Sequence, residues 1–120
     1  MSDLGWIGAG GCLGSIARFS VGAFVQSSLG GERFPYGTLA VNVVGCLAIG
    51  ILAERLESRD ARAFWVIGFL GGFTTFSAFG NETLELARGA EPWLAAVYVG
   101  ASVVLGLAAV LLGRTIALSG

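Results

Sequence analysis

Four long apolar stretches, joined by short polar loops, fill almost the whole 120-residue chain. They cover about residues 4–29, 36–53, 63–87 and 93–118. A transmembrane α-helix needs about 20 mostly apolar residues, so each stretch can cross a bilayer. Charged residues make up 12% of the chain, against about 25% in a soluble domain. The sequence therefore predicts an all-α membrane protein, with residues 1–120 forming a single domain of four transmembrane helices.

Residue types that are missing exclude several functions. The chain has no histidine, which removes histidine-based acid–base catalysis and histidine metal ligands, so we expect no enzyme. It has no basic face that could bind nucleic acid. Cys12 and Cys46 lie inside apolar stretches, where thiols usually act as small packing residues. The N-terminus lacks the basic region and cleavage site of a signal peptide, so we expect none to be removed.

Small and polar residues interrupt the third apolar stretch at its centre. Residues 71–79 read GGFTTFSAF, and their phenylalanines recur at every third position, which would align them on a helix. Adjacent glycines weaken a helix, so Gly71 and Gly72 are its expected weak point. Inside a bilayer, backbone groups freed by a break must find partners or line a polar cavity. We therefore expect a broken third helix with a polar, ion-handling site, with simple close packing as the alternative.

A cation lies within the first apolar stretch. Gly10, Gly14, Arg18 and Gly22 are spaced by four residues and therefore share one helix face. Such a face of small residues lets a second helix approach closely. Arg18 has two open interpretations. Its side chain reaches water or a structural partner, or it gives an aqueous vestibule a positive potential that attracts anions.

Polar side chains also occur in the second and fourth stretches. The amide of Asn42 needs hydrogen-bond partners inside a membrane, and it can bond a neighbouring helix or donate to an anion. Tyr98, Ser102 and Gly106 are spaced by four, which gives the fourth helix one hydroxyl-bearing face. That face either joins helices or forms a polar track along a pore.

The expected topology places both termini and the second loop on one side of the membrane. Gly30 to Pro35 form the first polar loop, and a turn around Pro92 forms the third. The two sides differ little in arginine content: one holds Arg55, Arg59, Arg62 and Arg114, and the other holds Arg33 and Arg88, with Arg18 added if its side chain reaches out. So small a bias is a weak topology signal, which favours insertion in both orientations and an antiparallel homodimer.

Three motifs, in this order along the chain, resemble those of the small fluoride channels of the Fluc (CrcB) type. Gly14 to Phe19 resemble the G-x-x-x-R-[FY] pattern of the first span. Gly37 to Gly45 resemble the G-T-x-x-x-N-x-x-G pattern of the second span, and Gly71 to Phe79 resemble the third-span signature. The resemblance covers nearly the whole chain. Two departures are Ala78, where a hydroxyl residue is commoner, and Gly106, where some members have serine.

The resemblance implies a multi-pass channel of the plasma (inner) membrane that passively exports cytoplasmic fluoride. It implies an antiparallel, dual-topology homodimer with two pores, and a structural sodium ion held by the backbone carbonyls of Gly71 and Thr74. Phe76 and Phe79 would form the aromatic pair of the pore. Arg18 would lie at the vestibule, and Glu82 matches an acidic position without an assigned role. The hydroxyl and amide groups near the pore would be Asn42, Thr75, Ser77, Tyr98 and Ser102.

The main alternative is a small, dual-topology, proton-coupled multidrug transporter. Such coupling requires a carboxylate deep in a span, usually the first. The first span here has only Asp3 at its edge, and Glu82 lies near the end of the third. A purely structural subunit is the other alternative, and it leaves the central cluster of the third span unexplained.

Overall fold

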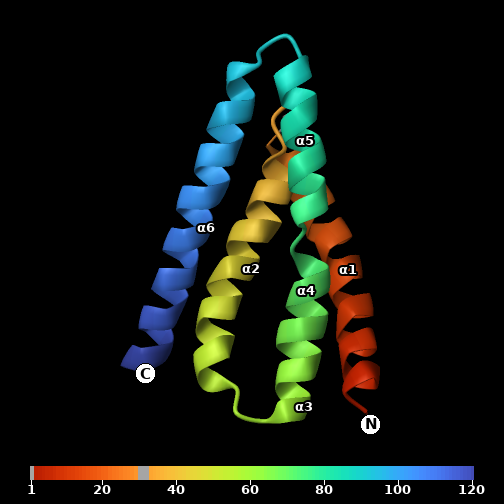
Figure 1. The fold of residues 1–120 in the computed structure, drawn as a ribbon, viewed down its shortest axis with the longest axis vertical. Coiled ribbons are helices and arrows are strands. Elements are labelled where there is room, and N and C mark those ends of the chain that lie inside the picture. The colour runs from red at the N-terminus through yellow and green to blue at the C-terminus, as the bar shows by residue number, and fades with distance from the viewer. Residues whose placement is uncertain (1, 30–32) are drawn as a thin grey trace.

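The computed structural model describes residues 2–29 and 33–120, and it is helical throughout (Figure 1). Residues 30–32 of the expected first loop lie outside this part. Four helical segments are long and apolar enough to cross a membrane. They are α1 (Asp3–Ser28), α2 (Tyr36–Arg55), a composite third segment (Arg59–Arg88) and α6 (Trp93–Ser119). This finding confirms the predicted all-helical architecture with four membrane-spanning helices.

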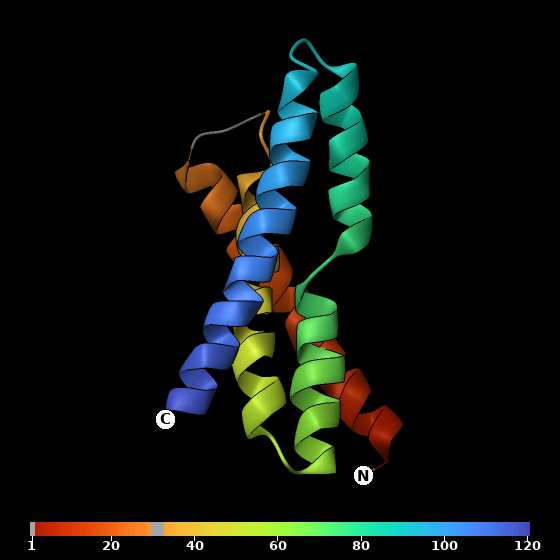
Figure 2. The same ribbon diagram turned by 60° about the vertical axis from the view of Figure 1, so that its left-hand side comes forward.

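The third segment is built from pieces. It comprises α3 (Arg59–Arg62), the π-helix η1 (Ala63–Leu70), α4 (Gly71–Phe73) and α5 (Phe76–Arg88). Both ribbon views show α4 and α5 joined by a short extended link at mid-height (Figures 1 and 2). The predicted interruption of the third helix is therefore present. The sequence contains no signal that predicted the π-helix before it.

The break lies one turn later than expected. Gly71 and Gly72 remain helical, and the extended residues are Thr74 (φ −90°, ψ 156°) and Thr75 (φ −149°, ψ 119°). Gly72 packs closely against α1 and has no room for a side chain, because a Cβ there would lie 2.6 Å from the Gly11 carbonyl oxygen. The Thr75 hydroxyl oxygen accepts a bond from the Ala78 amide at 3.1 Å and so caps α5. A capping residue, and not the glycine pair, determines where the helix restarts. The break also removes Phe73 from the stripe expected with Phe76 and Phe79.

Close glycine contacts hold the helices together. Gly10 and Gly14 are buried where α1 crosses η1, and a Cβ on Gly14 would lie 2.0 Å from the Phe69 carbonyl oxygen. Gly37 approaches Gly22 equally closely, since its Cβ would lie 2.3 Å from the Gly22 oxygen. The expected contact face on the first helix is thereby confirmed, and it has two partners: η1 and α2.

Both termini lie at the same end as the link between α2 and α3 (Figure 1). The end of α1, the start of α2 and the turn between α5 and α6 lie at the opposite end (Figure 1). The charged run 54–62 is less of a loop than expected, because only residues 56–58 separate α2 from α3. The Arg62 guanidinium donates to the carbonyls of Ala53 and Leu56 at 2.7 and 2.8 Å, which satisfies the C-terminal end of α2.

Candidate functional site

Asn42, in the middle of α2, anchors the break in the third helix. Its side-chain oxygen accepts a hydrogen bond from the Thr75 amide at 2.9 Å, and its NH₂ group donates to the Thr75 carbonyl at 3.1 Å. One amide therefore satisfies both backbone groups of the extended residue. The sequence left two kinds of partner open for Asn42, a neighbouring helix or an anion. In the structure its partner is the neighbouring third segment, at Thr75. Its bonds stabilise non-helical backbone inside an apolar region, where unpaired groups are expensive.

The same contact frees carbonyl groups at the end of α4. In a continuous helix the Gly71 carbonyl would accept from the Thr75 amide, which here donates to Asn42. The Thr74 amide and hydroxyl both turn back to the Leu70 carbonyl, at 3.0 and 2.9 Å. Within residues 2–29 and 33–120, no hydrogen bond reaches the carbonyl oxygens of Gly71 or Thr74. The structure thus offers backbone oxygens that could bind a cation.

Hydroxyl groups cluster just after the break. The Thr75 and Ser77 hydroxyls lie 3.2 Å apart, and either oxygen can donate to the other. The Ser102 hydroxyl is buried and has no hydrogen-bond partner among the described residues; the Tyr98 hydroxyl is also buried and lies near the Thr38 side chain without making a hydrogen bond of good geometry. Buried polar groups without partners are uncommon in native proteins. These hydroxyls are free to interact with a ligand or with water.

Four aromatic rings form a row that connects α5, α6 and the start of α2. The ring centres of Phe76 and Phe79 are 5.6 Å apart, and those of Phe79 and Tyr98 are 5.2 Å apart. Phe34 meets Tyr98 edge-on at 5.5 Å. We call Phe34, Tyr98, Phe79 and Phe76 the aromatic row. Tyr98 is fully buried, whereas Phe76 is 83% exposed at the outer end of the row.

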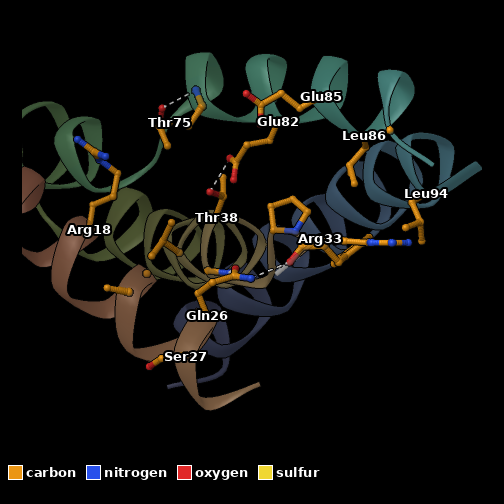
Figure 3. A pocket seen from close by; sticks show the side chains of 18 of the residues that line it. Arg18, Gln26, Ser27, Arg33, Thr38, Thr75, Glu82, Glu85, Leu86 and Leu94 are labelled. Carbon is orange, nitrogen blue, oxygen red and sulfur yellow. Dashed lines mark hydrogen bonds between the residues drawn. The ribbon is translucent and has the colours of Figure 1, made fainter. Parts of the chain in front are cut away.

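A cavity of about 1120 Å³ opens between α1, α2 and α5 (Figure 3). We call it the vestibule. Arg18 lines it and donates from Nε to the Gly72 carbonyl at 3.0 Å. Of the two interpretations of Arg18, the structure shows the structural partner, and attraction of anions by its charge stays a prediction. Arg33 and Glu91 line the vestibule as well and form an ion pair.

Glu82 also lines the vestibule and meets α2 there. The Thr38 hydroxyl donates to Glu82 Oε1 at 2.7 Å, and the two side chains point toward one another in Figure 3. Thr38 was part of a motif in the sequence but received no separate role. Its position one helical turn before Asn42, on the same face of α2, is the signal that could have identified it.

A second cavity, of about 460 Å³, lies beside the break. It brings together most of the predicted site residues, namely Asn42, Gly71, Thr74, Thr75, Phe76, Phe79 and Ser102. Tyr98 contacts this group through Phe79, and Ser77 through Thr75. Arg18 and Glu82 lie apart, in the vestibule. Thr75 is the residue that the described linings of the two cavities share.

The sequence was also compared with those of known proteins. Residues 5–114 match the family model described as CrcB-like protein, Camphor Resistance (CrcB). The chain belongs to the CrcB family. Similar members include a protein of Acidobacterium capsulatum, 42% identical over 92% of both chains, and one of Rhizobium etli strain CIAT 652, 44% identical over 92% of this chain and 91% of the relative. A protein of Rubrobacter xylanophilus is 46% identical over 94% of this chain and 80% of its own length.

The names of these CrcB relatives state a function. The first two are named Fluoride-specific ion channel FluC, and the third Fluoride-specific ion channel FluC 2. The family resemblance predicted from the three sequence motifs is confirmed. These relatives are ion channels and not enzymes, in agreement with the prediction that the chain has no enzymatic activity.

Proposed function

We propose that this CrcB protein is a fluoride-selective channel. The observation that supports the proposal most is the position of Thr75. This residue lines both the vestibule, which contains Arg18, and the second cavity, which Phe76 and Phe79 line. An anion attracted by Arg18 would meet the hydroxyls of Thr75 and Ser77 before it reaches the aromatic pair. The names of the relatives, at 42–46% identity, support fluoride as that anion.

The residue types suit fluoride. Fluoride is small and holds its water tightly, so a pore must replace the hydration shell with good hydrogen-bond donors. The unpartnered hydroxyls of Tyr98 and Ser102 can donate, and the positive edges of Phe76 and Phe79 can face an anion. A narrow passage between ring edges would hinder larger halides. Asn42 has both polar ends bound to Thr75, so it contributes by holding the break.

Passive flow through such a pore would follow the fluoride gradient. In acidic surroundings neutral HF crosses the bilayer and dissociates inside the cell, where fluoride accumulates. Outward leak through a channel in the plasma (inner) membrane would lower that concentration. We therefore propose fluoride detoxification by passive export as the physiological role.

Efflux from liposomes that contain the purified protein tests the function. Vesicles loaded with fluoride or with chloride are compared at equal protein content, with empty vesicles as the control. Fast fluoride efflux with little chloride efflux is expected. Folded protein that releases no fluoride would contradict the channel and would direct attention to proton-coupled transport through Glu82.

Replacing Phe76 or Phe79 with isoleucine should lower fluoride flux by about tenfold, because isoleucine keeps the bulk but lacks the positive ring edge. The measurement is initial fluoride efflux per folded protein. Phe24→Ile is the matched control, since Phe24 is also highly exposed, at 71%, but lies on α1 away from the break. Unchanged flux in both pore variants would remove these rings from the ion path.

The proposed assembly is an antiparallel, dual-topology homodimer with two pores. The small difference in arginine content between the two ends supports it, as do the exposed Phe76 and Gly71 beside the break, which a second copy would cover. In a chain with Cys12 and Cys46 replaced by alanine, a cysteine at position 57 should react partly with impermeant reagent from each side. A cysteine at position 90, at the opposite end of the helices, should also react partly from each side of the membrane. Labelling from one side only would contradict dual topology.

The proposed sodium ion would be held by the carbonyls of Gly71 and Thr74 from both copies. Among the described residues no three His, Cys, Asp or Glu side chains cluster as metal ligands, so backbone oxygens are the fitting donors. When bound, the cation would offset the energy of moving an anion into a low dielectric. Protein purified throughout in N-methylglucamine buffer should gain several degrees of melting temperature when sodium is added, because the folded dimer alone offers the site. An equal gain with N-methylglucamine added at the same ionic strength would argue against it.

A further inference from the structure

The helix α2 begins without a capping side chain of its own. Its N-cap residue is Pro35, which makes no side-chain hydrogen bond to the first turn. The first amides of a helix have no partner within the helix and are usually bound by a Ser, Thr, Asp or Asn at the N-cap. At this position α2 depends on another part of the chain.

Gln26, near the end of α1, supplies the missing contact. Its Oε1 accepts a hydrogen bond from the Gly37 amide at 2.9 Å, and Gly37 lies in the first turn of α2. Its Nε2 donates to the Phe34 carbonyl at 2.9 Å. Figure 3 shows the Gln26 side chain on the vestibule wall, reaching from α1 toward the start of α2. One neutral amide therefore ties α1 to both the loop and the helix that follows it.

Gln26 is connected to the proposed pore in two ways, and the first runs through Phe34. Phe34 is half-buried and packs edge-on against Tyr98, and the aromatic row continues from Tyr98 through Phe79 to Phe76. A shift of the Phe34 backbone would displace the Tyr98 ring, because the two rings are in edge-on contact and Tyr98 is fully buried in a closely packed interior.

The second link runs along α2. Thr38 follows Gly37 directly and bonds Glu82, and Asn42 follows one turn later and holds the break at Thr75. The axial position of α2 therefore determines whether both contacts form. The close approach of Gly22 and Gly37 sets the spacing of the two helices, and the amide of Gln26 sets how far α2 can slide along α1.

We propose that Gln26 is a positioning residue of the ion pathway: by capping α2 and holding Phe34, it keeps the aromatic row and the Thr38 and Asn42 contacts in their conducting geometry. The proposal rests on the proposed fluoride-channel function. It assigns Gln26 no direct contact with the ion.

The test uses the full-length protein with Gln26→Met, which keeps side-chain length and removes both polar ends. Fluoride efflux per folded protein should fall by about tenfold, since two hydrogen bonds to the backbone are lost. Backbone hydrogen exchange should become several times faster at the start of α2 and stay unchanged in α6. Ser28→Ala is the matched control, because Ser28 is an exposed polar residue two positions further along the same helix and lines neither cavity, and it should leave both measurements unchanged.

The exchange measurement does not depend on transport, so it separates this proposal from the proposed function. Wild-type protein without fluoride efflux would contradict the function, while faster exchange in Gln26→Met would still support the cap. Unchanged exchange, or an equal loss of flux in Ser28→Ala, would overturn the role of Gln26.

Two further variants complete the test. If Gln26→Met does not fold, Gln26→Asn replaces it: the shorter amide remains polar but cannot reach both partners, and unchanged flux would overturn the proposal. Combining Gln26→Met with Thr38→Val should lower flux by less than the product of the single effects, because both changes act on α2. If the flux loss of the double variant equals the product of the two single losses, Gln26 and Thr38 act independently. That result would overturn the proposal that Gln26 acts through the position of α2.

Discussion

Asn42→Ala should reduce fluoride flux by about a hundredfold, because it leaves two backbone groups of Thr75 without partners in an apolar region. The Asn42 side chain donates to the Thr75 carbonyl and accepts from the Thr75 amide. Each buried group left unpaired costs about 1–3 kcal/mol, so the variant protein should abandon the extended link and re-form helix there. The Gly71 carbonyl would then accept from the Thr75 amide and no longer be free for a cation. Initial fluoride efflux from liposomes measures the effect.

Asn81→Ala is the matched control for Asn42. Asn81 is also an asparagine within a membrane-spanning segment, but it is exposed on α5, beyond the break. Its replacement should change flux by less than twofold, since a surface substitution usually alters free energy by less than about 0.5 kcal/mol. Equal fluxes from Asn42→Ala and the wild-type protein would mean that the Thr75 link forms without the amide and would contradict its anchoring role.

Gly14→Ala should lower the melting temperature by about 10 °C, the largest stability effect expected from adding a single carbon atom. A Cβ at this position would lie 2.0 Å from the Phe69 carbonyl oxygen and 3.0 Å from its Cα. Both are backbone atoms of η1, so relief requires α1 and η1 to separate. Overpacking of this kind lowers the free energy of unfolding by about 3 kcal/mol. The better helix propensity of alanine offsets about 1 kcal/mol of this loss. Thermal unfolding in detergent is the measurement.

Gly8→Ala provides the comparison on the same helix. A Cβ on Gly8 would meet no atom within 4 Å, so alanine should be neutral or slightly stabilising. The pair separates close packing from a general intolerance of substitution in α1. If Gly14→Ala has the same melting temperature as the wild-type protein, η1 can move away from α1 without a loss of stability, and the prediction is wrong.

The sequence by itself determined the four membrane-spanning segments, because the length and apolarity of a stretch decide whether it can cross a bilayer. It also indicated the interrupted third helix, since the polar cluster of residues 71–79 is local information. The family followed from the order of the three motifs, which is likewise read along the chain. In all three cases the deciding property belongs to neighbouring residues.

Tertiary structure decided where the break falls and what surrounds it. The extended link at Thr74 and Thr75 depends on Asn42, 33 residues earlier in sequence, and the Arg18 bond to Gly72 spans 54 residues. Phe34 similarly meets Tyr98 only through packing of α2 against α6. Inside a bilayer, a backbone group that leaves its helix must bond to another part of the protein or line a polar cavity. The partner of such a group is therefore a property of helix packing, and local sequence cannot specify it.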